Sequence, residues 1–271
     1  MILTIFLLAS IALTSSASYV KVIEPYNATI INNGSVFLGK VGPGQTFFIT
    51  INSSTTNNTG YLINLGWNRL IAAAIPAGWT AENSSLNRNR LSVELTPSPN
   101  AANGTYEFNL SAINTGNESG VGTLNFRAYV NVTPNVFKLS VTPKAIVSSP
   151  GEPTNLYITI NNTGVSDNPF TVSVQNVPAW NNTQTVIALH HTTGHFIYPI
   201  YGYTPGVYNA KVYVSSLTSP IVYREENITY TVKASLENDY YAIGEGTVSF
   251  PILYEPAYAV MYFVGLIMHH L

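Results

Sequence analysis

Apolar and polar residues alternate in several short segments of the chain. In residues 91–95, 170–174 and 228–232, every second side chain is apolar. A period of two predicts half-buried β-strands, because successive side chains of a strand point to opposite faces of a sheet. Asn-Gly, Thr-Gly, Pro-Gly and Asn-Pro pairs separate such segments at intervals of about 8–12 residues, which is typical of a β-sandwich. The pattern therefore predicts an all-β protein.

One segment departs from this alternation. Residues 70–75, with the sequence LIAAAI, are continuously apolar and are followed by Pro76. Between Ser18 and Glu255 this is the one local helix candidate, and the proline would end the helix.

Turn and strand signals occur twice at nearly equal spacing. In the first copy, Pro43-Gly44 precedes an apolar strand pattern and Gly104 opens a later one; in the second copy, Pro150-Gly151 and Gly206 stand in the same places. A repeat of this kind predicts two copies of one β unit. We expect tandem antiparallel sandwiches over residues 19–134 and 135–234, followed by a stalk over 235–256 with one further strand at 247–253.

The N-terminus has the pattern of a secretory leader. Residues 2–13 are almost entirely apolar, and Ser15 and Ala17 supply the small residues that a signal peptidase reads. We therefore expect residues 1–17 to be a signal peptide and the protein to be exported, although no basic residue precedes the apolar run. A buried N-terminal element and an uncleaved anchor are the alternatives.

The C-terminus carries a second apolar run, AYAVMYFVGLIM, within residues 257–271. Twelve helical residues extend only ~18 Å, whereas the hydrocarbon core of a bilayer is roughly 30 Å thick. We interpret the segment as a short membrane-anchoring helix that locally thins the bilayer or continues past Leu271. The alternative is a last strand or helix that packs on the second unit.

Composition narrows the function classes. Charged residues make up 9% of the chain, against about 25% in a typical soluble domain. The net charge of −2 provides no basic field for nucleic acid, whose binding depends on phosphate neutralisation. The absence of cysteine excludes disulfides, thiolate metal sites and cysteine nucleophiles.

Asparagine in the Asn-x-Ser/Thr context is frequent, at roughly twice the number that a random order of the same residues would give. Such sequons are acceptors for N-glycosylation in exported proteins, and glycans would compensate for the scarce charge. We expect at least half of them to be modified, and we leave out Asn131 because Pro134 follows its threonine. The other sequon asparagines are Asn27, Asn33, Asn52, Asn57, Asn83, Asn103, Asn109, Asn117, Asn161, Asn181 and Asn227.

The repeated signals also resemble a known group of modules. A Pro-Gly step into a strand, a strand ending in Asn-x-Gly, a Pro-x-Gly-Trp or Pro-x-Trp turn and a late Gly-x-Tyr strand are similar to the NEW3 and CARDB-like immunoglobulin-type modules of exported, often archaeal, proteins. The resemblance covers about 200 of the 271 residues. It implies Ig-like sandwiches of seven or eight strands in a surface protein, with no active site carried over.

The resemblance also implies places for individual residues. Pro43-Gly44 and Pro150-Gly151 would form the turns that lead into strands. Trp79 and Trp180 would pack near the turn edge of each core, and Tyr106 and Tyr208 would lie on each penultimate strand. The second copy lacks a glycine before Trp180, so we expect its tryptophan turn to differ from the first.

Few residues suggest chemistry. His190, His191 and His195 are the one dense histidine group and are weak candidates for a metal site. The nearest carboxylate, Asp167, is far along the chain, and a solvated turn is the simpler interpretation. Glu237 and Asp239 could contribute to a calcium site, but they fall short of a full ligand set.

Catalysis has little support. Glu225 and Glu226 are adjacent and would point to opposite faces of a strand, so they do not form a glycosidase pair. The chain contains neither a Gly-x-Ser-x-Gly elbow nor a phosphate-binding glycine loop. We expect a protein that is not an enzyme and has no cofactor.

Tyr198, Tyr201 and Tyr203 are the best candidates for stacking against a sugar, although cross-strand packing is the common role of such tyrosines. The sequence thus predicts a non-catalytic, exported cell-surface protein that presents tandem Ig-like modules to other surface proteins or glycans. The membrane would be contacted through the C-terminal segment. The alternative is a carbohydrate-binding accessory module.

Overall fold

The computed structural model describes residues 18–57, 59–84, 89–116 and 121–233. The described residues form an all-β protein and contain no helix, and hence none that is long and apolar enough to cross a membrane. The expected signal peptide, stalk, strand at 247–253 and C-terminal anchor lie outside the described residues.

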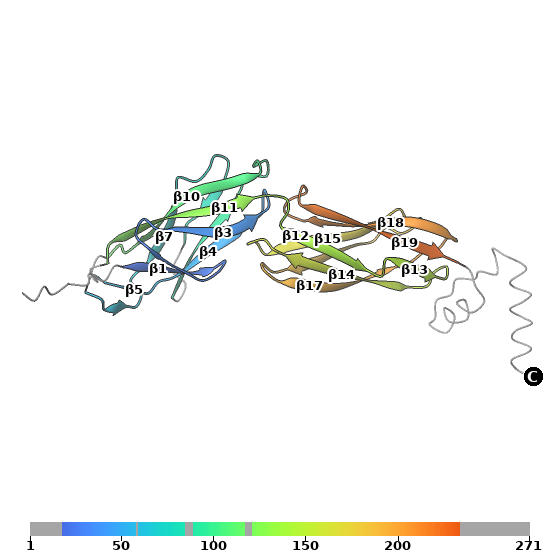
Figure 1. Ribbon diagram of the computed structural model, residues 1–271, viewed down its shortest axis with the longest axis horizontal. Coiled ribbons are helices and arrows are strands. Elements are labelled where there is room, and N and C mark those ends of the chain that lie inside the picture. Colours follow the sequence, from blue (N-terminus) through green and yellow to red (C-terminus); the bar gives the residue numbers. More distant parts are fainter. Residues whose placement is uncertain (1–17, 58, 85–88, 117–120, 234–271) are drawn as a thin grey trace, which may run out of the picture. The chain divides into compact units, whose positions relative to one another are not determined.

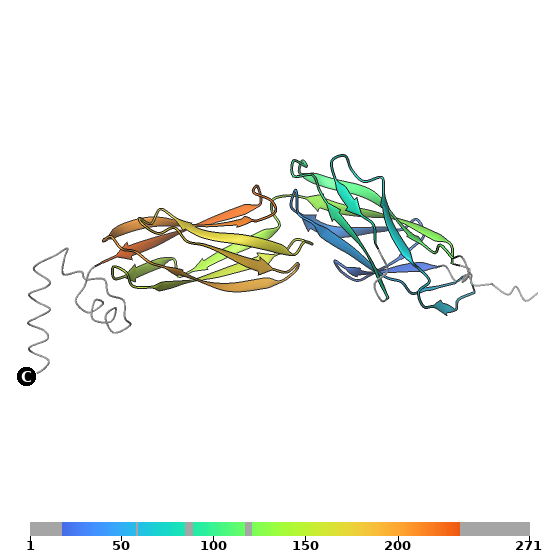
Figure 2. The same cartoon turned by 180° about the vertical axis from the view of Figure 1, so that it is seen from behind.

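The chain divides into two compact units. Among the described residues, those within 18–38, 48–96 and 105–130 belong to the first unit, and those within 39–47, 97–104 and 131–233 belong to the second. Each unit is built from β-sheets, coloured along the chain in Figure 1 and seen from behind in Figure 2.

The first unit contains two main sheets. One has the strand order β2 (Ala28–Ile31), β1 (Tyr19–Glu24), β4 (Phe47–Asn52), β9 (Arg90–Thr96) and β8 (Thr80–Glu82). The other has the order β3 (Ser35–Val41), β11 (Thr123–Val132), β10 (Gly104–Ile113) and β7 (Arg69–Ala73). A small pair joins β5 (Thr55–Thr56) to β6 (Leu62–Ile63).

The second unit has the same two-sheet plan. Its smaller sheet has the order β12 (Phe137–Thr142), β14 (Thr154–Asn162) and β17 (Thr193–Ile200). Its larger sheet has the order β13 (Ala145–Ser148), β19 (Tyr223–Val232), β18 (Gly206–Ser216), β15 (Asn168–Gln175) and β16 (Thr183–Ala188). The pairing of β13 with β19 is parallel. Strands β12-β14-β17 and β19-β18-β15 correspond to the A-B-E and G-F-C groups of an immunoglobulin-like sandwich.

The core of the second unit follows directly from strand alternation. Leu156, Ile158 and Ile160 of β14 are buried, while the residues between them face outward. Phe170 of β15 lies inside as well, with its ring centroid 4.6 Å from that of Phe137 on β12. The strands expected at 91–95, 170–174 and 228–232 are confirmed as β9, β15 and β19.

The prediction of a helix at residues 70–75 is wrong, because the segment Arg69–Ala73 forms strand β7. β7 pairs antiparallel with β10, from Arg69 opposite Ile113 to Ala73 opposite Asn109. Leu70 is fully buried. A continuous apolar run this short does not distinguish a helix from a buried strand, and here the backbone pairing with β10 decides the outcome.

The turns that lead into β4 and β14 are confirmed. Gly44 and Gly151 have φ values of +74° and +80°, a left-handed conformation that glycine adopts without steric cost. Tyr106 lies on β10 and Tyr208 on β18, which are the penultimate strands of the two units.

The two tryptophan turns share one hydrogen-bond pattern and one left-handed position, contrary to the expectation that they differ. Trp79 N–H donates to the carbonyl of Pro76 at 3.2 Å, and Trp180 N–H donates to that of Val177 at 3.3 Å. The residue before each tryptophan has a positive φ, +77° at Gly78 and +59° at Ala179. The second copy therefore keeps the turn without glycine, and its alanine adopts a left-handed conformation.

This conformation predicts a stabilising substitution. Ala179→Gly should raise the free energy of unfolding by about 0.5–1 kcal/mol, because the strain of a left-handed alanine exceeds the entropy cost of glycine. Urea denaturation of the two proteins measures the difference. The reciprocal change Gly78→Ala is the matched control and should lower stability by about 1 kcal/mol; a loss of stability in both variants would show that the two turns are not equivalent.

Candidate functional site

An open groove of about 990 Å³ lies on the outer face of strands β1, β4, β9 and β8 in the first unit. Nine of its ten lining side chains are polar or charged, and the exception is Phe48, which is 49% exposed. The groove is lined by Glu24, Phe48, Thr50, Glu82, Asn83, Ser84, Asn89, Arg90, Ser92 and Glu94.

A register shift in β1 places Glu24 in the groove. Val22, two positions earlier, is fully buried, and strict alternation would turn Glu24 to the same inner face. The pairing with β4 is irregular between Val22 and Glu24, so that Glu24 lies opposite Thr50. Such a bulge redirects the following side chain, and here it supplies a carboxylate to the outer face.

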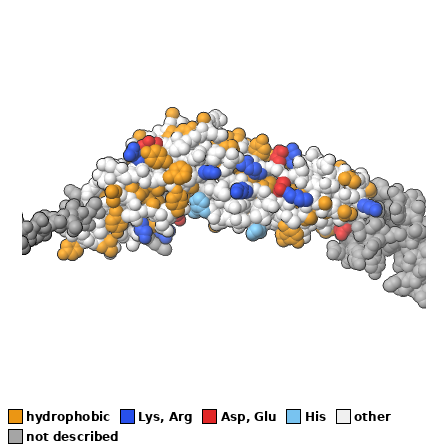
Figure 3. Space-filling view, viewed as in Figure 1, with side chains coloured by type: hydrophobic (Ala, Val, Ile, Leu, Met, Phe, Trp, Pro, Cys, Tyr) orange, Lys and Arg blue, Asp and Glu red, His pale blue; other side chains and the backbone are white. Residues whose placement is uncertain are grey.

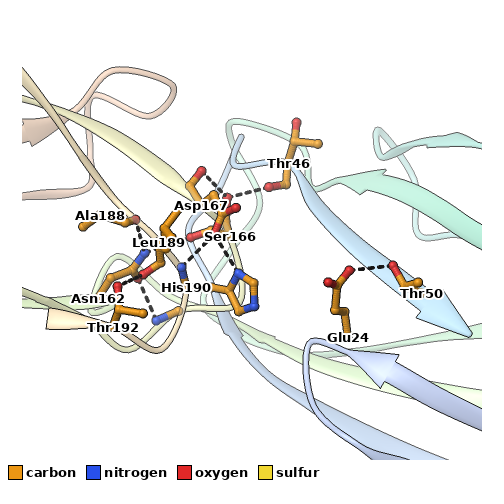
Figure 4. A network of polar contacts seen from close by, with 11 residues as sticks. Glu24, Thr46, Thr50, Asn162, Ser166, Asp167, Ala188, Leu189, His190 and Thr192 are labelled. Atoms are coloured by element: carbon orange, nitrogen blue, oxygen red, sulfur yellow. Dashed lines mark hydrogen bonds and ion pairs between the residues drawn. The ribbon is translucent and has the colours of Figure 1, made fainter. Parts of the chain in front are cut away.

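Hydrogen bonds hold the floor of the groove. The Thr50 hydroxyl donates to a Glu24 carboxylate oxygen at 2.7 Å, a contact drawn in Figure 4. The Ser92 hydroxyl lies 2.9 Å from that of Thr50. Because Thr50 has one hydroxyl proton and Glu24 accepts it, Ser92 must be the donor to Thr50. The floor is thus a directed chain that ends on a carboxylate.

Two further carboxylates lie on the groove wall. Glu82 of β8 stands directly opposite Glu94 of β9, where Cβ atoms are typically about 5 Å apart. Within the described part of the chain neither carboxylate forms an ion pair. The groove therefore offers hydrogen-bond acceptors, donors from Arg90 and the amides, and one apolar ring, a combination suited to a polar ligand with many hydroxyl groups.

The predicted sugar-stacking tyrosines do not form one exposed face. Tyr198 is 1% exposed, donates its hydroxyl to the carbonyl of Asn182 at 2.6 Å and has its pKa raised by burial. Tyr201 is half-buried, with its ring centroid 4.9 Å from that of Trp180, and Tyr203 is 50% exposed. Tyr198 occupies an inward position of β17, so the interpretation of this residue as a ligand contact is corrected.

The three histidines point to different partners. His190 Nδ1 lies 2.6 Å from the Asp167 carboxylate, which also accepts the backbone N–H of His190 at 2.7 Å (Figure 4). His195 Nδ1 lies 3.1 Å from the Thr159 hydroxyl. Burial, and then the neighbouring His190, lower the pKa of His191. No group of three metal-binding side chains is found among the described residues.

Asp167 precedes His190 by 23 residues in the sequence, but the fold brings their side chains into contact. β15 pairs with β16 so that Asn168 lies opposite Ala188. Asp167 directly precedes Asn168 and His190 closely follows Ala188, so this pairing brings Asp167 and His190 together. The adjacent carboxylates of β19 have separate partners: Glu225 pairs with Lys211 at 2.8 Å and Glu226 pairs with Lys144. Glu237 and Asp239 lie outside the described residues.

The sequon asparagines differ in exposure. Within the described part of the chain, none of the eleven described sequon asparagines donates a hydrogen bond from its Nδ2, the atom that N-glycosylation modifies, whereas four other asparagines do. The donating residues are Asn68, Asn114, Asn162 and Asn176. The exposed sequon asparagines are Asn27, Asn33, Asn83, Asn103, Asn109, Asn161, Asn181 and Asn227. Asn52, Asn57 and Asn131 are half-buried, and Asn117 lies outside the described residues.

Comparisons with known proteins do not place the chain in a family. No protein-family model matches the sequence, and no curated protein matches it either. Among solved structures, it is similar to the fibronectin(III)-like modules of Clostridium thermocellum CbhA, at 12% identity and a TM-score of 0.28, over 79% of this chain and 94% of that one.

Two further structures show a similar level of likeness. A chimeric titin Z1Z2 matches at 10% identity and a TM-score of 0.36, over 81% of this chain and all of that one. The β-glucosidase from Listeria innocua in complex with glucose matches at 14% identity and a TM-score of 0.27, over 36% of this chain and 16% of that one. At these scores the likenesses carry no argument about function.

The facing carboxylates predict a charge effect on stability. Glu82→Gln should raise the free energy of unfolding by about 0.2–1 kcal/mol, because it removes repulsion from Glu94 directly opposite. The gain should shrink at high salt, which screens exposed charges. Glu107→Gln is the matched control, because Glu107 instead has a cation, Arg127, at 3.8 Å; thermal unfolding should show no gain for this variant.

Proposed function

We propose that the protein is an exported, N-glycosylated cell-surface protein whose tandem Ig-like modules contact other surface proteins without catalysing a reaction. The observation that carries this proposal is the exposure of the sequon asparagines. Of the eleven that the structure describes, eight are exposed. A sequon functions as an acceptor in a secreted chain when it lies on the surface.

The character of the surface supports the same proposal. Figure 3 shows charged side chains in a few small groups among uncharged and hydrophobic ones on the face in view. Exposed apolar residues such as Ile187, Ile197 and Val207 occupy outward positions of the second unit. N-linked glycans would supply the hydration that ionised side chains provide in other soluble domains.

The proposed placement on the cell surface rests on the two ends of the sequence. The leader pattern of residues 1–17 would direct export, and the apolar segment within 257–271 would hold the chain at a membrane. We further propose kinship with the NEW3 and CARDB-like modules. In support, the Pro-Gly and tryptophan turns have matching geometry in the two copies.

The test is intact-mass analysis and fractionation of the protein from its native cells. We expect membrane-associated material that starts at Ser18 and exceeds the unmodified polypeptide by glycan-sized steps. Deleting residues 256–271 should release the protein into the medium. Retention of this variant on cells contradicts the anchor, and a soluble, unmodified chain that retains Met1 contradicts export.

The groove of the first unit favours a second candidate, carbohydrate binding. Its hydroxyl, amide and carboxylate groups can bind sugar hydroxyls, and the exposed ring of Phe48 can stack on a pyranose. Phe48→Ala should abolish retention on a polysaccharide affinity gel, whereas Tyr203→Ala, which removes an exposed ring outside the groove, should leave retention unchanged. If the unsubstituted protein and both variants migrate equally in gels with and without polysaccharide, carbohydrate binding in this groove is contradicted.

A further inference from the structure

A second, smaller hollow of about 510 Å³ lies on the other sheet of the first unit, over strands β10 and β11. Its lining residues include Asn33, Asn109, Ser111, Asn125 and Arg127. Asn33 and Asn109 are both sequon asparagines, within Asn33-Gly34-Ser35 and Asn109-Leu110-Ser111. Two potential glycan acceptors that are far apart in the sequence therefore border one concave surface.

Asn125 of β11 brings the two acceptors together. Its carbonyl accepts the backbone N–H of Asn33 at 2.7 Å, which fixes the turn between β2 and β3 against β11. Its Oδ1 accepts the hydroxyl of Ser111, two positions after Asn109 on β10, at 2.7 Å. The positions of both sequons thus depend on one residue of the central strand.

Both acceptor groups are available for modification. Asn33 and Asn109 are exposed, and within the described structure neither Nδ2 has a hydrogen-bond partner. We propose that the N-linked glycans of Asn33 and Asn109 share this hollow and pack against each other and against the sheet. The proposal rests on the N-glycosylation in the proposed function and adds to it a specific pair of interacting glycans.

The covalent step is the transfer of an oligosaccharide from a lipid diphosphate carrier to each asparagine. Each Nδ2 loses one proton and bonds to the anomeric carbon of an oligosaccharide, whose diphosphate-linked lipid carrier leaves with the bonding electrons. No group is oxidised or reduced.

The lining suits the first sugars of a glycan. Asn125 and Arg127 are among the lining residues, and an amide and a guanidinium both carry N–H donors that can bind sugar hydroxyls. The guanidinium of Arg127 lies 3.8 Å from Glu107, so its other N–H groups remain for a sugar. The volume of about 510 Å³ falls within the range of about 300–1,000 Å³ that small-molecule sites have. Covalent attachment keeps each sugar at a high effective concentration beside the hollow, so weak contacts suffice to hold it.

The two glycans would also protect the edges of this sheet from pairing with the strands of another chain. Its edges are β3 and β7. Asn33 lies just before β3, and Asn109 lies opposite Ala73 of β7. A glycan at each position would stand beside an unpaired backbone edge, where a bulky hydrophilic group opposes pairing with another chain.

The test is site-resolved mass spectrometry of the glycoprotein during exoglycosidase digestion. In Asn33→Gln, the glycan of Asn109 should be trimmed at least about threefold faster than in the unsubstituted protein, because the enzyme acts on sugars that have left the hollow. Asn109→Gln should have the same effect on the glycan of Asn33. Asn227→Gln removes a sequon of the second unit and should change neither rate.

Ser35→Ala is the second variant, because it removes the sequon of Asn33 while keeping its side chain, and it should reproduce the effect of Asn33→Gln. Trimming rates that do not depend on the other glycan overturn the shared hollow. Modification of other sequons but not of Asn33 or Asn109 also overturns it, while the proposed function stands. Absence of glycan from every sequon overturns both.

Discussion

Apolar packing between paired sheets is the constraint on which the whole structure depends. The chain has no cysteine, so no disulfide supports either sandwich. In the second unit, β14 and β15 contribute side chains such as Leu156 and Phe170 to one continuous core. The two buried tyrosines contribute their rings to it only because their hydroxyls are satisfied, Tyr230 by Ser148 and Tyr198 by a backbone carbonyl. The outward positions of the same strands are then free for other roles.

Strand alternation explains how much could be predicted from the sequence. β9, β15 and β19 were predicted correctly because each has one apolar face. β7 was not, because both of its faces are apolar and only its pairing with β10 identifies it. Ala179 was missed because a positive φ at alanine has no signal in the sequence when glycine is the expected residue.

The candidate sites depend on strand register, which the sequence does not display. Glu24 reaches the groove through a bulge, and its hydrogen-bond partner there, Thr50, comes from β4, later in the chain. Asp167 meets His190 because β15 and β16 are paired. For the same reason Tyr198 looked like part of an aromatic surface, although its position in β17 turns it into the core.

Adjacent asparagines show how alternation separates a structural role from an available acceptor. Asn161 and Asn162 are neighbours on β14, and only Asn161 begins a sequon. Asn162 is 1% exposed and donates from Nδ2 to the carbonyls of Ser166 and Ala188, whereas Asn161 points outward with its amide free. A one-residue slip of this strand would bury the acceptor and expose the structural amide. The register that builds the core therefore also determines which asparagines a glycan could occupy, so the fold and the proposed surface chemistry depend on one constraint.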